Sequence, residues 1–232
     1  MSTTIVTGVS GGIGGAVAEQ LLRDGHRIIG VDIAEPVEKI EGVEYLSADL
    51  SSEEGIAALL RGLDSIGVNE IDSLVHCAGV GQWSSLADTP RVEWERILRI
   101  NLFGTIGITQ ALSPMIRDEG SVVLFGSGTA FKGPANMAIY VASKGGVIAF
   151  ARSLADELRF RAITVNVVCP GYTATPMVES IAHTESANIA TRAIKRSAVP
   201  ADIIGTVQFL ISPQSRFVTG QAISVDGGSV RR

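Results

Sequence analysis

The side chains that could support chemistry begin with a tyrosine and a lysine four positions apart, Tyr140 and Lys144. On a helix this spacing puts both side chains on one face. A free tyrosine has a pKa near ~10, but an ammonium within about 4–6 Å favours the phenolate and lowers that pKa. The pair could therefore exchange a proton with a substrate oxygen while a hydride moves. Such a pair also occurs in helices without a chemical role, so its surroundings decide its meaning.

A glycine-rich turn near the N-terminus could hold a phosphate. It follows the apolar run Thr4–Thr7 and reads Gly8-Val9-Ser10-Gly11-Gly12-Ile13-Gly14. Glycines allow a sharp turn and let backbone amides approach a pyrophosphate at the positive end of a helix. A plain strand-to-helix turn could have the same composition. Its place between the first strand and the first helix favours the phosphate site.

Asp32 bears on which nucleotide this turn would hold. It follows Gly14 at close to the roughly 20-residue distance expected of a ribose-binding carboxylate. Such a carboxylate accepts hydrogen bonds from ribose hydroxyls and repels a 2′-phosphate. Ile33 and Ala34 follow it, and position 11 is glycine rather than arginine. We therefore expect NAD rather than NADP as the cofactor.

The elements that must position these residues alternate between short apolar runs and longer segments of helical period. The expected strands are Thr4–Thr7, Arg27–Val31, Glu44–Leu46, Ile71–His76, Ser121–Phe125, Thr164–Val168 and Ala222–Val225. The expected helices include Gly12–Arg23, Ser52–Leu63, Val92–Met115, Ile139–Arg159 and Ala201–Ile211. This alternation is typical of an α/β fold, a parallel sheet with helices on both faces.

Several local features refine this organisation. Ser51 and Glu54 have the spacing of a helix capping box, and Pro200 opens the last long helix. The short interval from Asp32 to Val43 leaves no room for a full helix. Residues 173–198 are weakly periodic and would suit a mobile lid over a pocket. With no repeat or linker to interrupt the alternation, residues 1–232 are expected to form a single domain.

Composition excludes several classes of protein. Lys and Arg total 19 against 24 Asp and Glu, and the net charge of −5 gives no field that would attract nucleic acid. The sequence shows neither a secretory signal nor an apolar stretch long enough to span a membrane. Cys77 and Cys169 are expected to be reduced thiols, and the protein to be cytoplasmic. The histidines show no metal-ligand spacing, so no metal site is expected.

Seven ordered motifs resemble the short-chain dehydrogenase/reductase family, in its compact single-domain branch, over nearly the whole chain. His76-Cys77-Ala78-Gly79 stands where that family usually has Asn-Asn-Ala-Gly, and Ser127 precedes Tyr140 at the family's spacing. The other matching segments are Thr7–Gly14, Asp49-Leu50, Ile100–Gly104 around Asn101, Pro170–Thr175, and Val218–Gln221 with Val225–Gly228. The resemblance implies a Rossmann-type doubly wound sheet of about seven parallel strands in the order 3-2-1-4-5-6-7.

The resemblance also implies roles for four side chains in a carbonyl–carbinol hydride transfer. Tyr140 would be the acid/base, and Ser127 would hydrogen-bond the reacting oxygen. Lys144 would bind the nicotinamide ribose and depress the tyrosine pKa. Asn101 would hold a water that links Lys144 to solvent. His76 is expected to be structural.

A cofactor-binding set and a substrate-binding set follow from the same matches. The residues expected to bind NAD are Gly8, Ser10, Gly12, Ile13, Gly14, Asp32, Ile33, Asp49, Leu50, Cys77, Ala78, Gly79, Tyr140, Lys144, Pro170, Gly171, Thr173 and Thr175. Those expected to bind substrate are Ser127, Gln82, Trp83, Phe131, Met137, Tyr140, Tyr172 and Met177. Core packing is the competing interpretation of each aromatic, Phe131 above all. With Lys132 and Gln82 as the polar elements of a largely apolar wall, an uncharged alicyclic or aromatic secondary alcohol is expected.

Three alternatives stay open at this stage. The pattern is also close to that of 3-oxoacyl-(acyl carrier protein) reductases, although Asp32 speaks against their usual NADP. A relative that binds NAD only as a sensor would typically lose the tyrosine or lysine, and both are present. A sugar-nucleotide epimerase would need a larger C-terminal domain. The family further implies a homotetramer built on the two long helices and the last strand, with Val147, Phe150 and Leu154 either outward or against the sheet.

Overall fold

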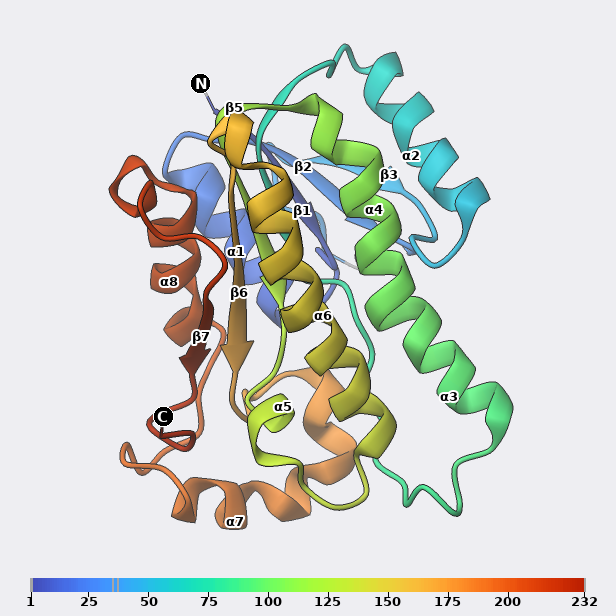
Figure 1. The fold of residues 1–232 in the computed structure, drawn as a ribbon, viewed down its shortest axis with the longest axis vertical. Helices are drawn as coiled ribbons and strands as arrows, with labels where there is room; N and C mark the ends of the chain where they lie inside the picture. The colour runs from blue at the N-terminus through green and yellow to red at the C-terminus, as the bar shows by residue number, and fades with distance from the viewer. Residues whose placement is uncertain (1, 35, 37, 232) are drawn as a thin grey trace.

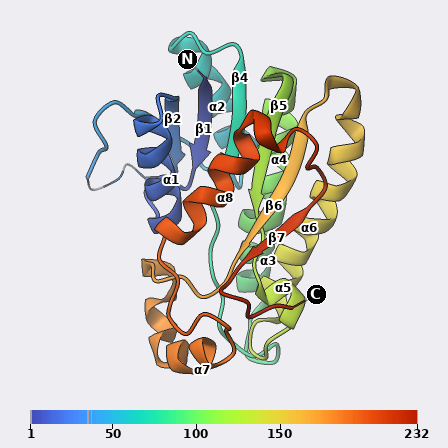
Figure 2. The ribbon, with the colours of Figure 1, turned by 90° about the vertical axis from the view of Figure 1, so that its left-hand side faces the viewer.

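The strands of the described residues form one parallel sheet in the order β3-β2-β1-β4-β5-β6-β7 (Figures 1 and 2). The computed structural model describes residues 2–34, 36 and 38–231. The strands are β1 (Thr3–Thr7), β2 (Arg27–Asp32), β3 (Glu44–Ser47), β4 (Ile71–His76), β5 (Ile116–Phe125), β6 (Thr164–Pro170) and β7 (Ala222–Val225). The order reverses between β1 and β4, which opens a crevice at their carboxyl ends. The expected class and strand order are confirmed.

Helices cover both faces of this sheet, because both faces of its central strands are apolar. The long helices are α1 (Gly12–Arg23), α2 (Glu53–Ser65), α3 (Arg91–Leu98), α4 (Gly104–Leu112), α6 (Ala138–Glu157) and α8 (Ala201–Ile211). One core joins α2, α4 and α6 to the sheet, and a second core joins α1 and α8 to the opposite face, which Figure 2 presents to the viewer. Along β5, Val122 and Leu124 enter the first core while Val123 and Phe125 enter the second.

The segment Val92–Met115, expected as one helix, follows one continuous helical path. Its backbone hydrogen-bonding pattern changes along that path. A π-helical turn, Arg99–Phe103, separates α3 from α4, and a 3₁₀ turn, Ser113–Met115, follows α4. Single π turns inside helices widen the helix by one residue and are frequent at functional sites. Asn101 lies inside this turn and is fully buried.

Two sequence-based expectations require correction, and one open alternative is decided. Helix α2 is capped by Ser52, whose Oγ accepts from the Gly55 amide at 3.1 Å, and not by Ser51, whose hydroxyl donates to Asp49. Strand β5 begins five residues before the expected Ser121, because an exposed polar stretch extends the buried apolar run. On α6, Val147 and Leu154 face the first core and are unavailable to a partner subunit.

The connection between β2 and β3 agrees with expectation. The described residues between β2 and β3 contain no helix. Residues 173–198 form a 3₁₀ segment, Pro176–Thr184, and a short helix, α7 (Glu185–Ala190), which lie below the carboxyl ends of the strands in Figure 1. A parallel bridge between Thr173 and Ala198 joins the two ends of this segment. None of the described helices is long and apolar enough to cross a membrane.

Two helical glycines should respond oppositely to alanine. A Cβ on Gly55 would lie 1.9 Å from the Asp49 carbonyl oxygen, whereas a Cβ on Gly205 would meet nothing within 4 Å. We expect Gly205→Ala to raise the free energy of unfolding by about 1 kcal/mol, because alanine is the better helix former. Gly55→Ala should lower it by about 1–3 kcal/mol through steric strain. Urea unfolding measures both, and shifts of the same sign would contradict the close approach.

Candidate active site

A cavity of about 810 Å³ opens at the carboxyl edge of the sheet and gathers most of the expected site residues. Three of the four expected catalytic side chains line it: Ser127, Tyr140 and Lys144. It also brings together Ile13, Cys77, Gly79, Pro170, Gly171, Thr173 and Thr175 of the expected cofactor set, and Gln82, Trp83, Met137, Tyr172 and Met177 of the expected substrate set.

Ser127 and Tyr140 form the reactive pair of this cavity. Ser127 follows β5, and its Oγ accepts from the Thr129 amide at 3.2 Å and from the Thr129 hydroxyl at 2.9 Å, both at the start of α5 (Thr129–Lys132). These bonds leave the Ser127 proton free to donate. Burial raises the pKa of Tyr140 above its ordinary value, and the hydrogen bond from Ser127 partly offsets this. The protonated phenol is therefore the stable form at neutral pH.

Lys144 lies one turn along α6 from Tyr140 and is 5% exposed. Its Nζ donates to the Phe125 carbonyl oxygen at 3.0 Å. Burial lowers the pKa of Lys144 to about 8. A Cβ on Gly79 would lie only 3.2 Å from this Nζ, so the glycine makes room for the ammonium. The expected lowering of the Tyr140 pKa by Lys144 is not what this structure shows, since burial of the phenol prevails.

Asn101 is fully buried, does not line the cavity, and holds the Val80 backbone by two hydrogen bonds. Its Oδ1 accepts from the Val80 amide at 2.8 Å, and its Nδ2 donates to the Val80 carbonyl at 2.9 Å. Nδ2 is also 3.2 Å from the Ser143 hydroxyl, which donates to the Tyr140 carbonyl oxygen. The π turn thus ties the strand-end segment to the helix that carries Tyr140. The side-chain amide of Asn101 has no hydrogen left for a water.

The glycine turn has the close approaches that a dinucleotide site requires. Gly8 has a φ of +68°, and a Cβ there would lie 2.8 Å from the Ala78 amide nitrogen. A Cβ on Gly14 would lie 2.1 Å from the Gly8 carbonyl oxygen, and one on Gly12 would lie 2.8 Å from the Thr175 side chain. Side chains at Gly8 and Gly14 would collide with neighbouring backbone, so the glycines let the turn close tightly at the start of α1. The residues present therefore fit a bound pyrophosphate.

Asp32 and Asp49 occupy the two strand ends expected to hold the nucleoside. The Asp32 carboxylate accepts from the Ser10 amide at 2.9 Å and from the Ile33 amide at 2.8 Å, which ties it to the glycine turn. The Asp49 carboxylate accepts from the Ser51 amide and hydroxyl at 2.9 and 2.7 Å. The carboxylate expected beside the ribose thus lies at the edge of the phosphate turn.

All but one of the residues expected to bind substrate line the cavity. Phe131 is not among the residues that line the cavity; it packs, half-buried, against the first core. Gln82 lines the cavity, but its amide nitrogen donates to the Ser84 carbonyl at 2.9 Å and is 3.2 Å from the Thr89 hydroxyl. Trp83, Met137 and Met177 leave this wall largely apolar.

Sequence reasoning missed the contribution of the C-terminal third of the chain. Asn188 and Arg192 from the end of the lid, and Asp226 and Ser229 from the turn after β7, line the cavity together with Lys132. The Asp226-Gly227-Gly228 motif was recognised only as a strand end. Both glycines have positive φ and fold the tail back over the site, and this is the signal that could have located it.

His76, at the end of β4, is buried in the core beside this site. Its Nδ1 is 2.7 Å from the Thr7 hydroxyl, which also accepts from the Ala78 amide at 3.2 Å. Burial and, to a lesser extent, the nearby Lys144 ammonium lower the pKa of His76 to about 3. The histidine is therefore neutral and joins β1 to β4, in keeping with the structural role expected for it.

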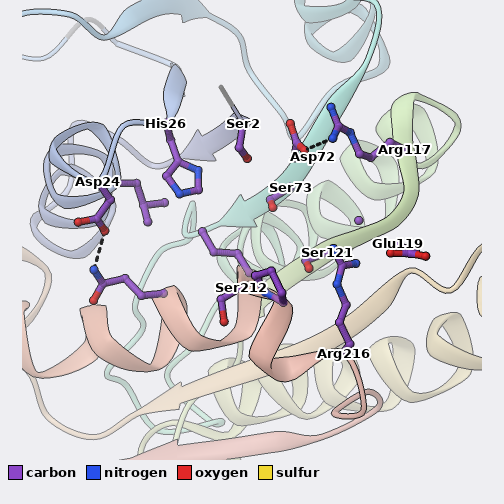
Figure 3. A pocket seen from close by; sticks show the side chains of 15 residues that line it. Ser2, Asp24, His26, Asp72, Ser73, Arg117, Glu119, Ser121, Ser212 and Arg216 are labelled. Atoms are coloured by element: carbon purple, nitrogen blue, oxygen red, sulfur yellow. Dashed lines mark hydrogen bonds and ion pairs between the residues drawn. The ribbon is translucent and has the colours of Figure 1, made fainter.

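A smaller cavity, of about 420 Å³, lies at the opposite, amino-terminal ends of the strands (Figure 3). Among its side chains, Asp72 forms an ion pair with Arg117 at 2.8 Å, and Asp24 accepts a hydrogen bond from the Gln208 amide at 2.6 Å. It lacks the serine, tyrosine and lysine of the larger cavity. Among the described residues, no group of three or more His, Cys, Asp or Glu side chains could hold a metal ion.

Comparison with known proteins supplies a further finding about this site. Residues 8–229 match the sequence profile of the family described as Enoyl-(Acyl carrier protein) reductase. The chain is 34% identical to the short-chain reductase protein NovJ of Streptomyces niveus, over 98% of this chain and 93% of that protein. It is 32% identical to the 3-oxoacyl-[acyl-carrier-protein] reductase FabG of Vibrio cholerae, over 97% of this chain and 95% of that protein.

Solved structures show the same architecture. Ligand-free aldohexose dehydrogenase (AldT) of Thermoplasma acidophilum superposes with a TM-score of 0.92 at 29% identity, covering 100% of this chain and 95% of that one. A 4-hydroxyisoleucine dehydrogenase complexed with NADH superposes with a TM-score of 0.89 at 25% identity, covering 99% of each chain. Both resemblances extend over the whole site described above.

The buried neutral His76 should make the protein sensitive to acid. Its pKa is lowered from 6.5 to about 3, so the unfolded chain binds a proton that the folded chain excludes. Stability present above about pH 6.5 is therefore lost as the pH falls, with a slope of up to about 1.4 kcal/mol per pH unit. His76→Asn should reduce this slope in urea unfolding between pH 7 and 4. The exposed His183→Asn is the control, and identical slopes in all three proteins would contradict the assignment.

Proposed function

Because the chain belongs to the short-chain dehydrogenase/reductase family, we propose that it is an NAD-dependent oxidoreductase that interconverts a secondary alcohol and a ketone. One observation carries the proposal. Ser127, Tyr140 and Lys144 come from a strand end and one helix face, and they line a single cavity at the carboxyl edge of the sheet. Sensors that only bind the cofactor have no need of this arrangement.

Tyr140 is the proton-transfer group in this proposal. Its buried phenol holds a proton at neutral pH, and that proton passes to the oxygen of a ketone as the oxygen gains negative charge. In the oxidative direction the phenolate accepts the proton of the alcohol. Ser127, oriented by Thr129, donates a hydrogen bond to the same substrate oxygen and so stabilises the developing charge.

Lys144, which lines the same cavity, supports this transfer. Its ammonium, held by the Phe125 carbonyl, adds positive potential beside the phenol. We assign it a further bond to the nicotinamide ribose. Since the Asn101 side chain is committed to Val80 and Ser143, the proposed water between Lys144 and solvent would bind the Asn101 main chain.

The nicotinamide cofactor, when bound, supplies or accepts the hydride. The glycine turn and the start of α1 would hold its pyrophosphate, and Asp32 the ribose of its adenosine half. The connection after Asp32 contains one basic residue, Lys39, which lies over the Tyr45 ring at 5.8 Å. A carboxylate at the ribose and no arginine in the turn favour NAD. That a similarly folded dehydrogenase was solved with NADH supports a nicotinamide cofactor here.

The substrate class is proposed from the wall that faces Tyr140. Trp83, Met137 and Met177 present apolar surface, and the lid residues Val178 and Ile181 continue it. Apolar walls favour an alicyclic or aromatic group next to the reacting carbon. Residues 1–232 would act as one cofactor-binding domain, with 173–198 as its lid.

A second candidate is a 3-oxoacyl-(acyl carrier protein) reductase, favoured by the 32% identity to FabG of Vibrio cholerae. Such an enzyme would reduce an acetoacetyl thioester faster than a simple cyclic ketone. Comparing the two rates with NADH and with NADPH distinguishes the candidates.

We further propose a cytoplasmic homotetramer. Val92 and Phe103, on the continuous helical path of α3 and α4, are 73% and 60% exposed. Exposed apolar side chains gathered on one element are typical of a subunit interface. Sedimentation of the purified protein measures the assembly.

Tyr140→Phe should lower turnover by about 10²-fold or more, because the Ser127 hydroxyl at the same oxygen is a far weaker acid than a phenol. Cofactor binding, followed by quenching of tryptophan fluorescence, should be nearly unchanged. Tyr45→Phe removes a hydroxyl far from the cavity and serves as the control that keeps its rate. Substantial activity in Tyr140→Phe would remove the tyrosine from its central role.

Asp32→Ser should narrow the preference for NAD over NADP by roughly tenfold, since a loss of about 1.4 kcal/mol of repulsion corresponds to that factor. Steady-state kcat/KM with each cofactor measures the ratio. Asp64→Ser, an exposed change on α2, should leave the ratio as it is. A wild-type enzyme that prefers NADP would overturn the cofactor assignment.

A further inference from the structure

A cluster of polar side chains occupies the end of the cavity that is formed by the lid and the C-terminal tail. It consists of Lys132 from α5, Asn188 and Arg192 from the end of the lid, and Asp226 and Ser229 from the turn after β7. We call these five residues the Lys132 cluster. It shares one cavity with Tyr140, so a molecule that reaches the tyrosine can also reach these residues.

The Lys132 ammonium is held in the cluster by hydroxyl groups. Its Nζ donates to the Ser229 hydroxyl and is 3.4 Å from Thr191 Oγ1. The Thr191 hydroxyl donates to the Asn188 carbonyl oxygen at 2.8 Å, and it lies 2.6 Å from Ser229 Oγ. The Ser229 proton must therefore point to Thr191, and both hydroxyls accept from the lysine. An ammonium has three donors, so at least one remains for another acceptor.

No carboxylate of the described residues lies within ion-pair distance of this ammonium. The acidic group of the cluster, Asp226, is buried, and its carboxylate accepts hydrogen bonds from backbone amides. Its Oδ1 accepts from the Gly228 and Ser229 amides at 3.0 and 3.1 Å, and its Oδ2 accepts from the Val230 amide at 2.7 Å. These bonds shape the turn that presents Ser229, and they keep the carboxylate from pairing with Lys132.

Arg192 adds a second positive charge to the same end of the cavity. Its guanidinium is 2% exposed and donates to the Tyr172 carbonyl at 2.6 Å and to the Arg196 carbonyl at 2.7 Å. Its Nε is buried and has no hydrogen-bond partner among the described residues. Both acceptors are uncharged carbonyl oxygens, and Asp202, whose pKa is lowered by Arg196 and more weakly by Arg192, is itself paired with Arg196 at 2.6 Å. Two cations therefore face one carboxylate in the Lys132 cluster.

The other charged groups that line the cavity do not alter this balance. Glu93 is paired with Arg96 at 2.7 Å, and Lys144 belongs to the Tyr140 site. Burial lowers the pKa of Lys132, while Asp226 raises it and Arg192 lowers it. Lys132 is exposed whereas Arg192 is buried, and a buried positive charge gains most from an anion that enters with its substrate.

We propose that the natural substrate carries a carboxylate, which binds Lys132 while the reacting carbon lies at Tyr140. Lys132 donates the direct hydrogen bond, and Arg192 contributes its field without contact. This inference rests on the proposed function and refines its substrate class: a hydroxy acid or keto acid with an apolar body. It replaces the sequence-based expectation of an uncharged substrate, because that expectation did not include Arg192 and Ser229.

Equilibrium binding tests the carboxylate directly. Protein saturated with NAD⁺, and in parallel with NADP⁺, is titrated with 3-benzoylpropionate and with its methyl ester by calorimetry; the oxidised cofactor prevents reduction. Homologous aryl keto acids, lengthened one carbon at a time, find the fitting span. We expect the best acid to bind about tenfold or more tightly than its ester, as for a hydrogen bond to a charged group.

Variants assign this difference to the lysine. Lys132→Gln should remove the acid-to-ester difference, and Lys132→Arg should restore much of it. Lys195→Gln, which removes another lysine charge at the end of the lid, is the matched control. Equal binding of acid and ester, binding of neither, or a difference that persists in Lys132→Gln would each overturn the inference.

Turnover separates this inference from the proposed function. Reduction of acid and ester at equal rates, lost in Tyr140→Phe, would support the oxidoreductase and overturn the carboxylate. Binding of the acid that depends on Lys132, with no reduction of any ketone, would uphold the carboxylate site and reject the oxidoreductase.

Discussion

The buried ammonium of Lys144 is the constraint on which the rest of the site depends. Its one direct acceptor is a strand-end carbonyl, that of Phe125, so the end of β5 and the start of α6 must keep a fixed separation. Gly79 must stay without a side chain to leave room for it. A buried cation costs free energy unless polar groups surround it. The buried ammonium places a positive charge in the same cavity as Tyr140.

The polar groups around Lys144 are hydrogen-bonded to one another and connect several elements of the fold. Asn101 fixes the Val80 backbone on one side and Ser143 of α6 on the other. Asn101 makes these contacts from within the π turn Arg99–Phe103, and such turns are frequent at functional sites. Ser127 is oriented independently, by Thr129. Tyr140 therefore meets a serine and a lysine whose positions come from different strands and helices, and this rigidity suits proton transfer.

The cavity has two chemically distinct ends. The apolar wall of Trp83, Met137 and Met177 selects shape, and such walls discriminate weakly between similar molecules. The Lys132 cluster is proposed to select charge, through the exposed ammonium of Lys132 and the buried guanidinium of Arg192. Arg192 joins the lid to Tyr172 and also lies at this end.

The sequence by itself determined the layers, the strand order through family motifs, and the chemistry-bearing residues, because strand and helix periods and glycine turns are local properties. Tyr140 and Lys144 share a helix, so their relation was also local. Tertiary structure alone decided which face of α6 is buried, that Ser52 rather than Ser51 caps α2, and that Phe131 packs into the core. It also brought Lys132, Arg192 and Ser229 together from segments far apart in the chain. Their meeting depends on the two left-handed glycines after Asp226 and on the bridge across the lid, and no local pattern encodes the distance between them.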